Sequence, residues 1–179
     1  MAFLTIYTPT YKRPKALAVC VESVLTQHKG WHVQHLIVPD EVGLGIDGMY
    51  ADIINHVDEV KGDYVLMLSD DDMLCNDKFV SNLLAFTKEN EKPEVIIIKA
   101  IKEGRILPSI WNAKPQLGHI DLSCFVVRSD IWKVNADKWG KRYEGDFDFI
   151  NSLWEQGYQF NWMDVVAVKA QRISRGQPE

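Results

Sequence analysis

The chain has 179 residues, of which 46% are hydrophobic and 25% are charged, and its formal net charge is −5. This length suits one hydrophobic core, and the acidic balance without a basic block disfavours nonspecific nucleic-acid binding. No apolar run approaches the ~20 residues that span a membrane, the N-terminus lacks a signal-peptide pattern, and the three cysteines lack metal-ligand spacing. We therefore expect one domain in a cytoplasmic protein.

The first hundred residues alternate strands with helices. Hydrophobic patterns predict strands over residues 3–8, 33–38, 64–68 and 95–99, with Pro9 stopping the first. Helices are predicted from Pro14 to Gly30, over residues 49–60 and over residues 77–89. This alternation is typical of an α/β fold with a mostly parallel sheet.

The pattern changes after residue 100. Residues 101–118 contain Gly and Pro interruptions, which predict short strands and a loop. Residues 119–128 have a strand core, residues 146–156 form a helical pattern, and residues 160–162 and 165–168 are two late strands. We expect these late strands to form a small antiparallel part.

Three consecutive carboxylates, Asp70, Asp71 and Asp72, follow the apolar strand 64–68. An apolar run of this length is typical of a strand buried on both faces, and such strands bind ligands at their carboxyl ends. Adjacent carboxylates repel one another unless a cation lies among them, and Asp oxygens suit Mg²⁺ or Mn²⁺. The alternative is an acidic turn that caps the next helix. The preceding strand favours a metal site.

Two other polar segments also follow predicted strands. The stretch from Thr8 to Arg13 (TPTYKR) follows the first, and Asp40 follows the second. Parallel strands place all these ends on the same edge of the sheet. Tyr11 could stack on a base, Asp40 could accept from a base N–H, and Arg13 could meet phosphate. The alternative for both segments is an ordinary turn.

Three short segments follow one another along the chain: the segment from Pro9 to Pro14, the SDDD sequence that ends at Asp72, and the YEGDFD sequence from Tyr143 to Asp148. Their order and spacing resemble those of a family 2 glycosyltransferase of the GT-A fold. The resemblance covers about residues 3 to 170. It implies a single Rossmann-like domain with a mostly parallel central sheet flanked by helices. It also implies that residues 1–100 bind a nucleotide and residues 101–179 bind an acceptor.

The resemblance assigns roles to individual residues. Nucleotide binding falls on Thr8, Pro9, Thr10, Tyr11, Arg13, Asp40 and Asp70. The metal, Mn²⁺ or Mg²⁺, falls on Asp71, with Asp72 beside it. The catalytic base falls on Asp146, at a helix start whose dipole favours an ionised carboxylate. Weaker acceptor-side candidates are Trp111, His119, Asp121 and Glu144. Apart from the resemblance, the tail residues Arg172 and Arg175 could hold the diphosphate, the alternative being a solvated basic tail. Two positions depart from the family pattern, since Ser69 and Gly145 stand where the family has acidic residues.

These parts suit a metal-dependent, inverting glycosyltransferase that moves a sugar from a nucleotide sugar, expected to be a UDP-sugar, to an acceptor hydroxyl. A divalent ion would stabilise the leaving diphosphate, and a single carboxylate would remove the proton of the acceptor. One base opposite the leaving group implies inversion. Two alternatives remain open at this point: a nucleotidyltransferase, and a catalytically inactive relative that binds nucleotide sugars.

Overall fold

The structure is a computed structural model that describes residues 2–28 and 32–171. Its α-helices are α1 (Pro14–Leu25), α2 (Gly45–Asp52), α3 (Phe79–Glu89), α4 (Ser129–Val134) and α5 (Gly145–Glu155). Its strands are β1 (Ala2–Thr10), β2 (Val33–Pro39), β3 (Gly62–Met67), β4 (Asp72–Leu74), β5 (Val95–Lys102), β6 (Arg105–Leu107), β7 (Phe125–Arg128) and β8 (Phe160–Ala170). Short 3-10 helices are η1 (Thr26–His28), η2 (Ile53–Glu59), η3 (Leu122–Cys124) and η4 (Ala136–Lys138).

All the strands belong to one sheet with the order β2-β1-β3-β7-β5-β8-β4, and β6 pairs with β5 beside this path. β1 is parallel to β2 and β3, and β5 is parallel to β8. β7 lies antiparallel between β3 and β5, so β1, β2, β3, β5 and β8 all point the same way. β4 and β6 are antiparallel to their partners. The predicted fold class is confirmed: a mostly parallel sheet with a smaller antiparallel part.

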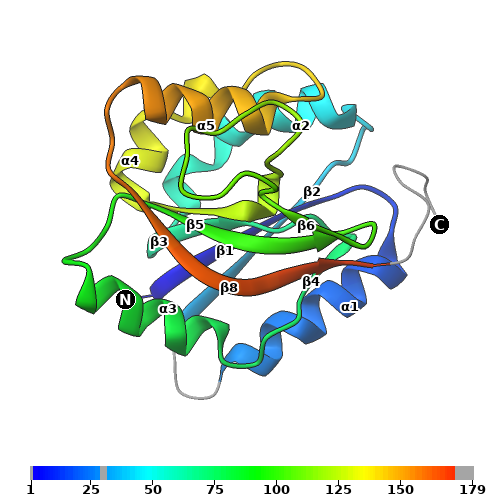
Figure 1. Cartoon of the computed structure of the whole chain (residues 1–179). Helices are drawn as coiled ribbons and strands as arrows, with labels where there is room; N and C mark the ends of the chain where they lie inside the picture. The colour runs from blue at the N-terminus through cyan, green and yellow to red at the C-terminus, as the bar shows by residue number, and fades with distance from the viewer. Residues whose placement is uncertain (1, 29–31, 172–179) are drawn as a thin grey trace.

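Helices cover both faces of this sheet. Figure 1 shows α1 and α3 on one face and α2, α4 and α5 on the other. α1 begins with Pro14, whose missing N–H is not needed in a first helical turn, and buries Ala16, Cys20 and Val24 at intervals of four residues. The central strands β3 and β5 are buried along most of their length, as continuous apolar runs predict. Among the described residues, no helix combines the length and apolar character that a membrane crossing requires.

Some predicted boundaries were wrong. Pro9 does not stop the first strand, since it pairs in register with Val38. The pairing of β1 with β3 ends at Tyr7, so Pro9, which has no N–H, interrupts no hydrogen bond between these two strands. The predicted helix 49–60 begins earlier, at Gly45, and continues beyond Asp52 as the 3-10 helix η2.

The two predicted late strands are one continuous strand, β8, which is parallel to β5 and antiparallel only to the short β4. The antiparallel part expected of the late strands is therefore made by β4, β6 and β7 instead. The register between β5 and β8 shifts near Lys99, so the residues between the two predicted pieces are absorbed by this irregularity. Gly30, which was predicted to end the first helix, lies outside the described residues.

Candidate active site

The carboxyl ends of the parallel strands meet at one edge of the sheet, as predicted. This edge carries Thr10 at the end of β1, Asp40 after β2 and the Asp triplet after β3. Lys102 ends β5, and Gln171 follows β8. Figure 1 shows the ends of β5 and β8 close to the start of α1, which follows β1. Segments far apart in the sequence are thus assembled into one polar cluster.

Asp70 and Asp71 form the first part of this cluster, held by Arg13. The Arg13 guanidinium lies 3.2 Å from Asp70 Oδ1 and 3.0 Å from Asp71 Oδ2. The Thr10 hydroxyl donates to Asp70 Oδ2 at 2.8 Å. Burial raises the pKa of Asp70 above its ordinary value, although the Thr10 hydrogen bond and Arg13 oppose this shift. The side chain of Asp71 stays 27% exposed, so it is the carboxylate of the triplet most open to a ligand.

Asp72 turns the other way and pairs with Lys102. The Lys102 ammonium contacts both Asp72 oxygens, at 2.7 and 2.5 Å, and also lies 3.1 Å from Asp121 Oδ1. Burial by itself would lower the pKa of Lys102, but Asp72 and Asp121 reverse the shift, so the amine stays charged. Asp72 is fully buried and both its oxygens are used, so we no longer expect it to reach a metal ion.

Asp146 lies in the first turn of α5, next to Asp121. Its Oδ1 accepts a hydrogen bond from the N–H of Phe147 at 2.7 Å, and the N–H of Leu122 also stabilises its charge. Burial, followed by the negative charge of Asp121, raises the pKa of Asp146 to about 7. The backbone N–H of Phe147 at the helix start favours the ionised carboxylate, as expected, but burial and the charge of Asp121 outweigh this contribution.

Gly145 explains the missing acidic residue before Asp146. A Cβ added at Gly145 would lie 2.3 Å from the carbonyl oxygen of Gly140 and 2.5 Å from the Tyr50 ring. The Tyr50 ring stacks on Trp139, and Trp139 in turn stacks on Phe149 with ring centroids 4.2 Å apart. This packing leaves no room for a side chain at position 145.

Within the described residues, the Glu144 side chain makes no hydrogen bond or ion pair with the polar cluster. Its side chain is 42% exposed, and its nearest charged partner is Arg142, at 3.8 Å. It precedes the helix without capping it through its side chain. The geometry favours Asp146 over Glu144 as the functional carboxylate of this segment.

The predicted nucleotide loop divides into a buried part and an accessible part. Thr8 is fully buried, and its hydroxyl lies 2.9 Å from His35 Nε2, inside the fold. Pro9 is also buried. The side chains of these two residues are therefore not accessible to a ligand, so their predicted contact with a nucleotide would have to come from the backbone. Tyr11 is half-buried and packs so closely on Gly43 that a Cβ there would lie 2.8 Å from its hydroxyl.

Asp40 organises the loop after β2. Its Oδ1 accepts from the N–H groups of Val42 and Gly43, at 3.1 and 2.7 Å, and its Oδ2 accepts from the N–H of Leu44 at 2.5 Å. A carboxylate has about four acceptor sites, so one remains for a base N–H. Asp40 therefore shapes the loop in addition to its predicted contact with a base.

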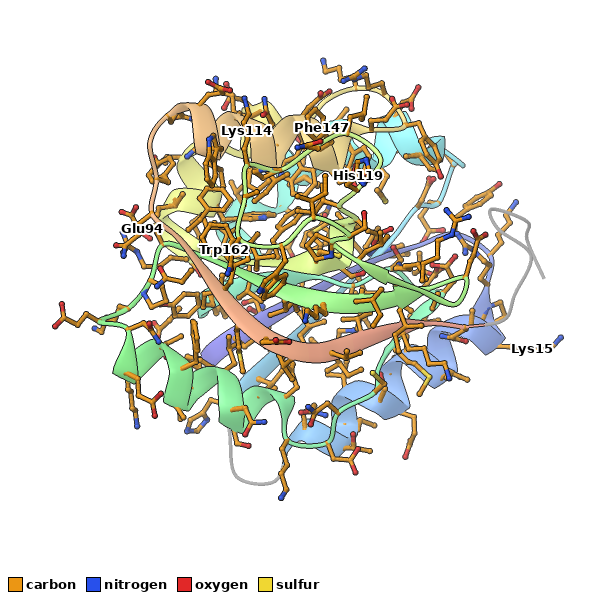
Figure 2. The ribbon with its side chains drawn as sticks, in the orientation of Figure 1. Lys15, Glu94, Lys114, His119, Phe147 and Trp162 are labelled. Atoms are coloured by element: carbon orange, nitrogen blue, oxygen red, sulfur yellow. The ribbon has the colours of Figure 1, made fainter. Side chains whose placement is uncertain are left out.

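The acceptor-side candidates are not all in one place. Asp121 belongs to the cluster, because it lies 3.1 Å from the Lys102 ammonium and its charge acts on Asp146. His119 is exposed and lies 2.7 Å from the Ser109 hydroxyl, closing the loop between them. Trp111 is half-buried, with the Lys99 ammonium 4.6 Å from its ring centroid. Figure 2 shows His119 and Phe147 on the same side of the sheet, the side that α5 covers.

Sequence reasoning missed two residues of the cluster, Lys102 and Gln171. Gln171 donates from its side chain to the carbonyl oxygens of Asp70 and Asp72, both at 3.2 Å, and its own N–H donates to that of Asp71 at 2.8 Å. Lys102 ends β5 and Gln171 follows β8, so the rule that identified Asp40 would also have identified them. Arg172 and Arg175 lie outside the described residues.

The carboxylates of the polar cluster do not by themselves surround a divalent ion. Within residues 2–28 and 32–171, no cluster of three or more His, Cys, Asp or Glu side chains converges on a metal position. Magnesium ions are commonly held by one or two carboxylates together with substrate phosphates, and Asp71 suits that arrangement. The chemistry of the site therefore fits an ion shared with a bound diphosphate rather than one enclosed by protein ligands.

No protein-family model matches the chain, and no curated protein sequence matches it. Solved structures share its fold. The structure of S. aureus TarS 1-349 matches with a TM-score of 0.71 at 16% identity, covering 94% of this chain and 60% of that one. The same fragment in complex with UDP-GlcNAc matches with a TM-score of 0.69 at 15% identity, covering 98% and 60%. This chain thus spans about three fifths of the TarS fragment.

A second solved protein has a related fold. CMP:2-keto-3-deoxy-manno-octonic acid synthetase complexed with CTP matches with a TM-score of 0.55 at 12% identity, covering 93% of this chain and 91% of that one. At these identities the likeness concerns the fold alone. It agrees with the α/β architecture expected from the sequence.

Proposed function

We propose that the protein transfers a sugar from a nucleotide sugar to an acceptor hydroxyl. One observation carries the proposal: a partly exposed carboxylate, Asp71, and a carboxylate with a pKa of about 7, Asp146, belong to the same polar cluster at the sheet edge. The fold is shared with a protein solved in complex with UDP-GlcNAc, a sugar nucleotide, which supports a uridine nucleotide as the donor.

The donor would bind along the ends of β1, β2 and β3. Tyr11 offers an aromatic face for the base, and the remaining acceptor site of Asp40 suits a base N–H. Arg13 already bridges Asp70 and Asp71, so its guanidinium is fixed where phosphate oxygens would arrive. A diphosphate would compete with these carboxylates for Arg13.

Asp71 would hold the divalent ion, Mn²⁺ or Mg²⁺, together with the diphosphate. When bound, such an ion supplies Lewis-acid stabilisation of the negative charge that develops on the leaving diphosphate. Arg13 adds a positive charge on the same side. The protein's own contribution here is to hold carboxylate and guanidinium together before the substrate arrives.

Asp146 would act as the general base. A base is most effective when its pKa lies near the working pH, because it is then both available and strong enough to take a proton. Burial and Asp121 place the pKa of Asp146 at about 7, and the N–H groups of Phe147 and Leu122 keep its carboxylate oriented. It would accept the acceptor's hydroxyl proton as the oxygen attacks the anomeric carbon. Attack from the face opposite the leaving diphosphate inverts that carbon.

The second candidate function is nucleotidyl transfer. The likeness to a CMP-sugar synthetase complexed with CTP, which covers most of both chains, favours it. Such an enzyme joins a nucleotide to a sugar acid and releases pyrophosphate, so it needs cations for a triphosphate near the first strand. Here Arg13 is already shared by two carboxylates, and Lys12 lies over the Tyr11 ring at 5.0 Å from its centroid. Because both of these cations already have partners within the protein, they suit a triphosphate less well.

Binding and product analysis test the proposal. Calorimetry with UDP, CDP and GDP, each with Mg²⁺, with Mn²⁺ and with chelator, should show metal-enhanced binding of a nucleoside diphosphate. Incubation with a panel of UDP-sugars and simple hydroxyl acceptors should then release UDP. Absence of nucleotide binding under all these conditions would contradict the proposal, and consumption of CTP with release of pyrophosphate would favour nucleotidyl transfer.

A further inference from the structure

Lys102 has an environment that the proposed roles leave unexplained. It ends β5 with its side chain only 13% exposed, and its contacts are carboxylate oxygens from two different segments. Asp72 is the first residue of β4 and the last of the Asp triplet. Asp121 precedes η3, and one of its oxygens also accepts from the hydroxyl and the N–H of Ser123, at 2.9 and 3.2 Å.

A buried ammonium held between two carboxylates is costly to assemble for stability alone. Each ion loses its hydration, and well-packed apolar residues often replace such groups without loss of stability. The same strand offers a comparison, since Lys99 pairs at 2.5 Å with Asp164, whose side chain is 75% exposed. Lys99 makes an ordinary surface pair, whereas Lys102 is built into the polar cluster.

The groups facing Asp146 identify what Lys102 can influence. They are Asp121 from the segment before η3, Tyr50 from α2, and the N–H groups of Leu122 and Phe147. Asp121 is the charged neighbour that disfavours ionisation of Asp146. Because Lys102 lies 3.1 Å from Asp121, it offsets part of that repulsion.

We infer that Lys102 is a positioning residue that joins the two sides of the site: its ammonium ties Asp72, beside the donor carboxylates, to Asp121, beside the base Asp146. It fixes Asp121 in place and moderates the field that Asp121 exerts on Asp146. This inference rests on the proposed function, in which Asp146 is the base. The link between Lys102, Asp121 and Asp146 can nevertheless be tested without any substrate.

The test follows the titration of the Asp146 carboxyl group by ¹³C NMR in the ligand-free protein. In K102M, Asp121 loses its compensating cation, so the midpoint of Asp146 should rise by roughly 0.5–1 pH unit, less than the 1–3 units typical of a directly contacting charge. In D121N the midpoint should fall, because the repelling charge is gone. K99M is the matched control and should leave the midpoint where it is in the wild type.

A double variant shows the route of the effect. If Lys102 acts mainly by positioning Asp121, K102M should shift the midpoint of Asp146 much less in the D121N background than in the wild type. An equal shift in both backgrounds would mean that the Lys102 charge acts on Asp146 directly and would overturn the positioning role. A folded K102M protein with the wild-type midpoint would overturn the inference and leave Lys102 a merely structural residue. Should K102M fail to fold, D121N decides, since an unchanged midpoint there would break the link between Asp121 and Asp146.

Activity measurements separate this inference from the proposed function. Where transfer is found, the acid limb of the pH–rate profile should move with the NMR midpoint in each variant. Expected NMR shifts without any transfer would contradict the function and keep the link. Transfer with no shift in any variant would keep the function and reject the link.

Discussion

The two ends of the polar cluster treat their carboxylates differently. At the donor end, Asp70 and Asp71 share Arg13, and Asp72 is held by Lys102, so each carboxylate has a cation within 3.2 Å. At the base end, the described partners of Asp146 are backbone N–H groups, and its charged neighbour is another carboxylate. At the donor end the cations oppose protonation, although burial still raises the pKa of Asp70 and raises that of Asp72 to about 6. At the base end a like charge adds to the effect of burial.

This difference indicates two different tasks. Carboxylates that are paired with cations suit the binding of cations and the placing of phosphates. A desolvated carboxylate beside a like charge exchanges its proton near neutral pH, which suits acid–base chemistry.

Removing the charge at the base end should affect turnover and leave binding intact. D146N should lower turnover about 10²- to 10⁴-fold, the usual contribution of general-base assistance, with donor affinity unchanged. E144Q is the control and should lose far less, because Glu144 points to Arg142 and solvent. Steady-state kinetics run beside calorimetry measures both. An inactive E144Q together with an active D146N would place the base two positions earlier.

Removing a charge at the donor end should affect binding instead. D71N should weaken metal-dependent binding of UDP by roughly 10- to 100-fold, the range of a lost charge-assisted contact, and leave the fold intact. Calorimetry with and without Mg²⁺ measures the difference. D164N removes an exposed carboxylate outside the cluster and serves as the control. Equal metal enhancement in D71N and the wild type would remove Asp71 from the metal site.

The raised pKa of Asp146 also predicts how stability depends on pH. Its pKa in the folded protein, about 7, lies above that of an unfolded aspartate, so its stabilising contribution is complete below about pH 4 and is lost as the pH rises through 7. D146N should therefore be more stable than the wild type at pH 8, by ~1–3 kcal/mol, and equal to it near pH 4. Urea denaturation at the two pH values checks this. A difference independent of pH would mean that Asp146 does not titrate abnormally.

Asp40 should show a smaller, local effect. D40A removes the acceptor for the N–H groups of Val42, Gly43 and Leu44, so we expect a loss of about 1 kcal/mol in stability, as for a lost cap. Nucleotide binding should weaken even without metal, since the proposed contact is to the base. Amide hydrogen exchange should show faster exchange at residues 42–44. Unchanged exchange there would contradict the role of Asp40 in shaping the loop.

The sequence predicts the sheet better than it predicts the site. Apolar runs such as Tyr64 to Leu68 are long enough to indicate buried strands, and parallel strands bring their carboxyl ends together whatever the details. For that reason the gathering of Arg13, Asp71 and their neighbours at one edge could be expected. The exact ends of strands, such as β1 running through Pro9, depend on which neighbouring strand pairs there.

Side-chain direction is where the sequence prediction failed. Thr8 and Thr10 lie two residues apart and look alike in sequence, yet Thr8 is buried against His35 while Thr10 donates to Asp70. Asp71 and Asp72 are neighbours that face different cations. The pKa of Asp146 depends on Asp121, which is distant in sequence. Such facts follow from three-dimensional packing and not from local pattern.

The central claim is that the sugar, and not the nucleotide, is transferred. Phosphorus NMR of a UDP-sugar incubated with the protein, Mg²⁺ and a hydroxyl acceptor tests it directly, because the products reveal which bond breaks. Cleavage between the anomeric carbon and its oxygen gives UDP, which we expect in the wild type and, far more slowly, in D146N. Formation of a sugar phosphate, with UMP either esterified to the acceptor or released by water, would show cleavage within the diphosphate and contradict the account.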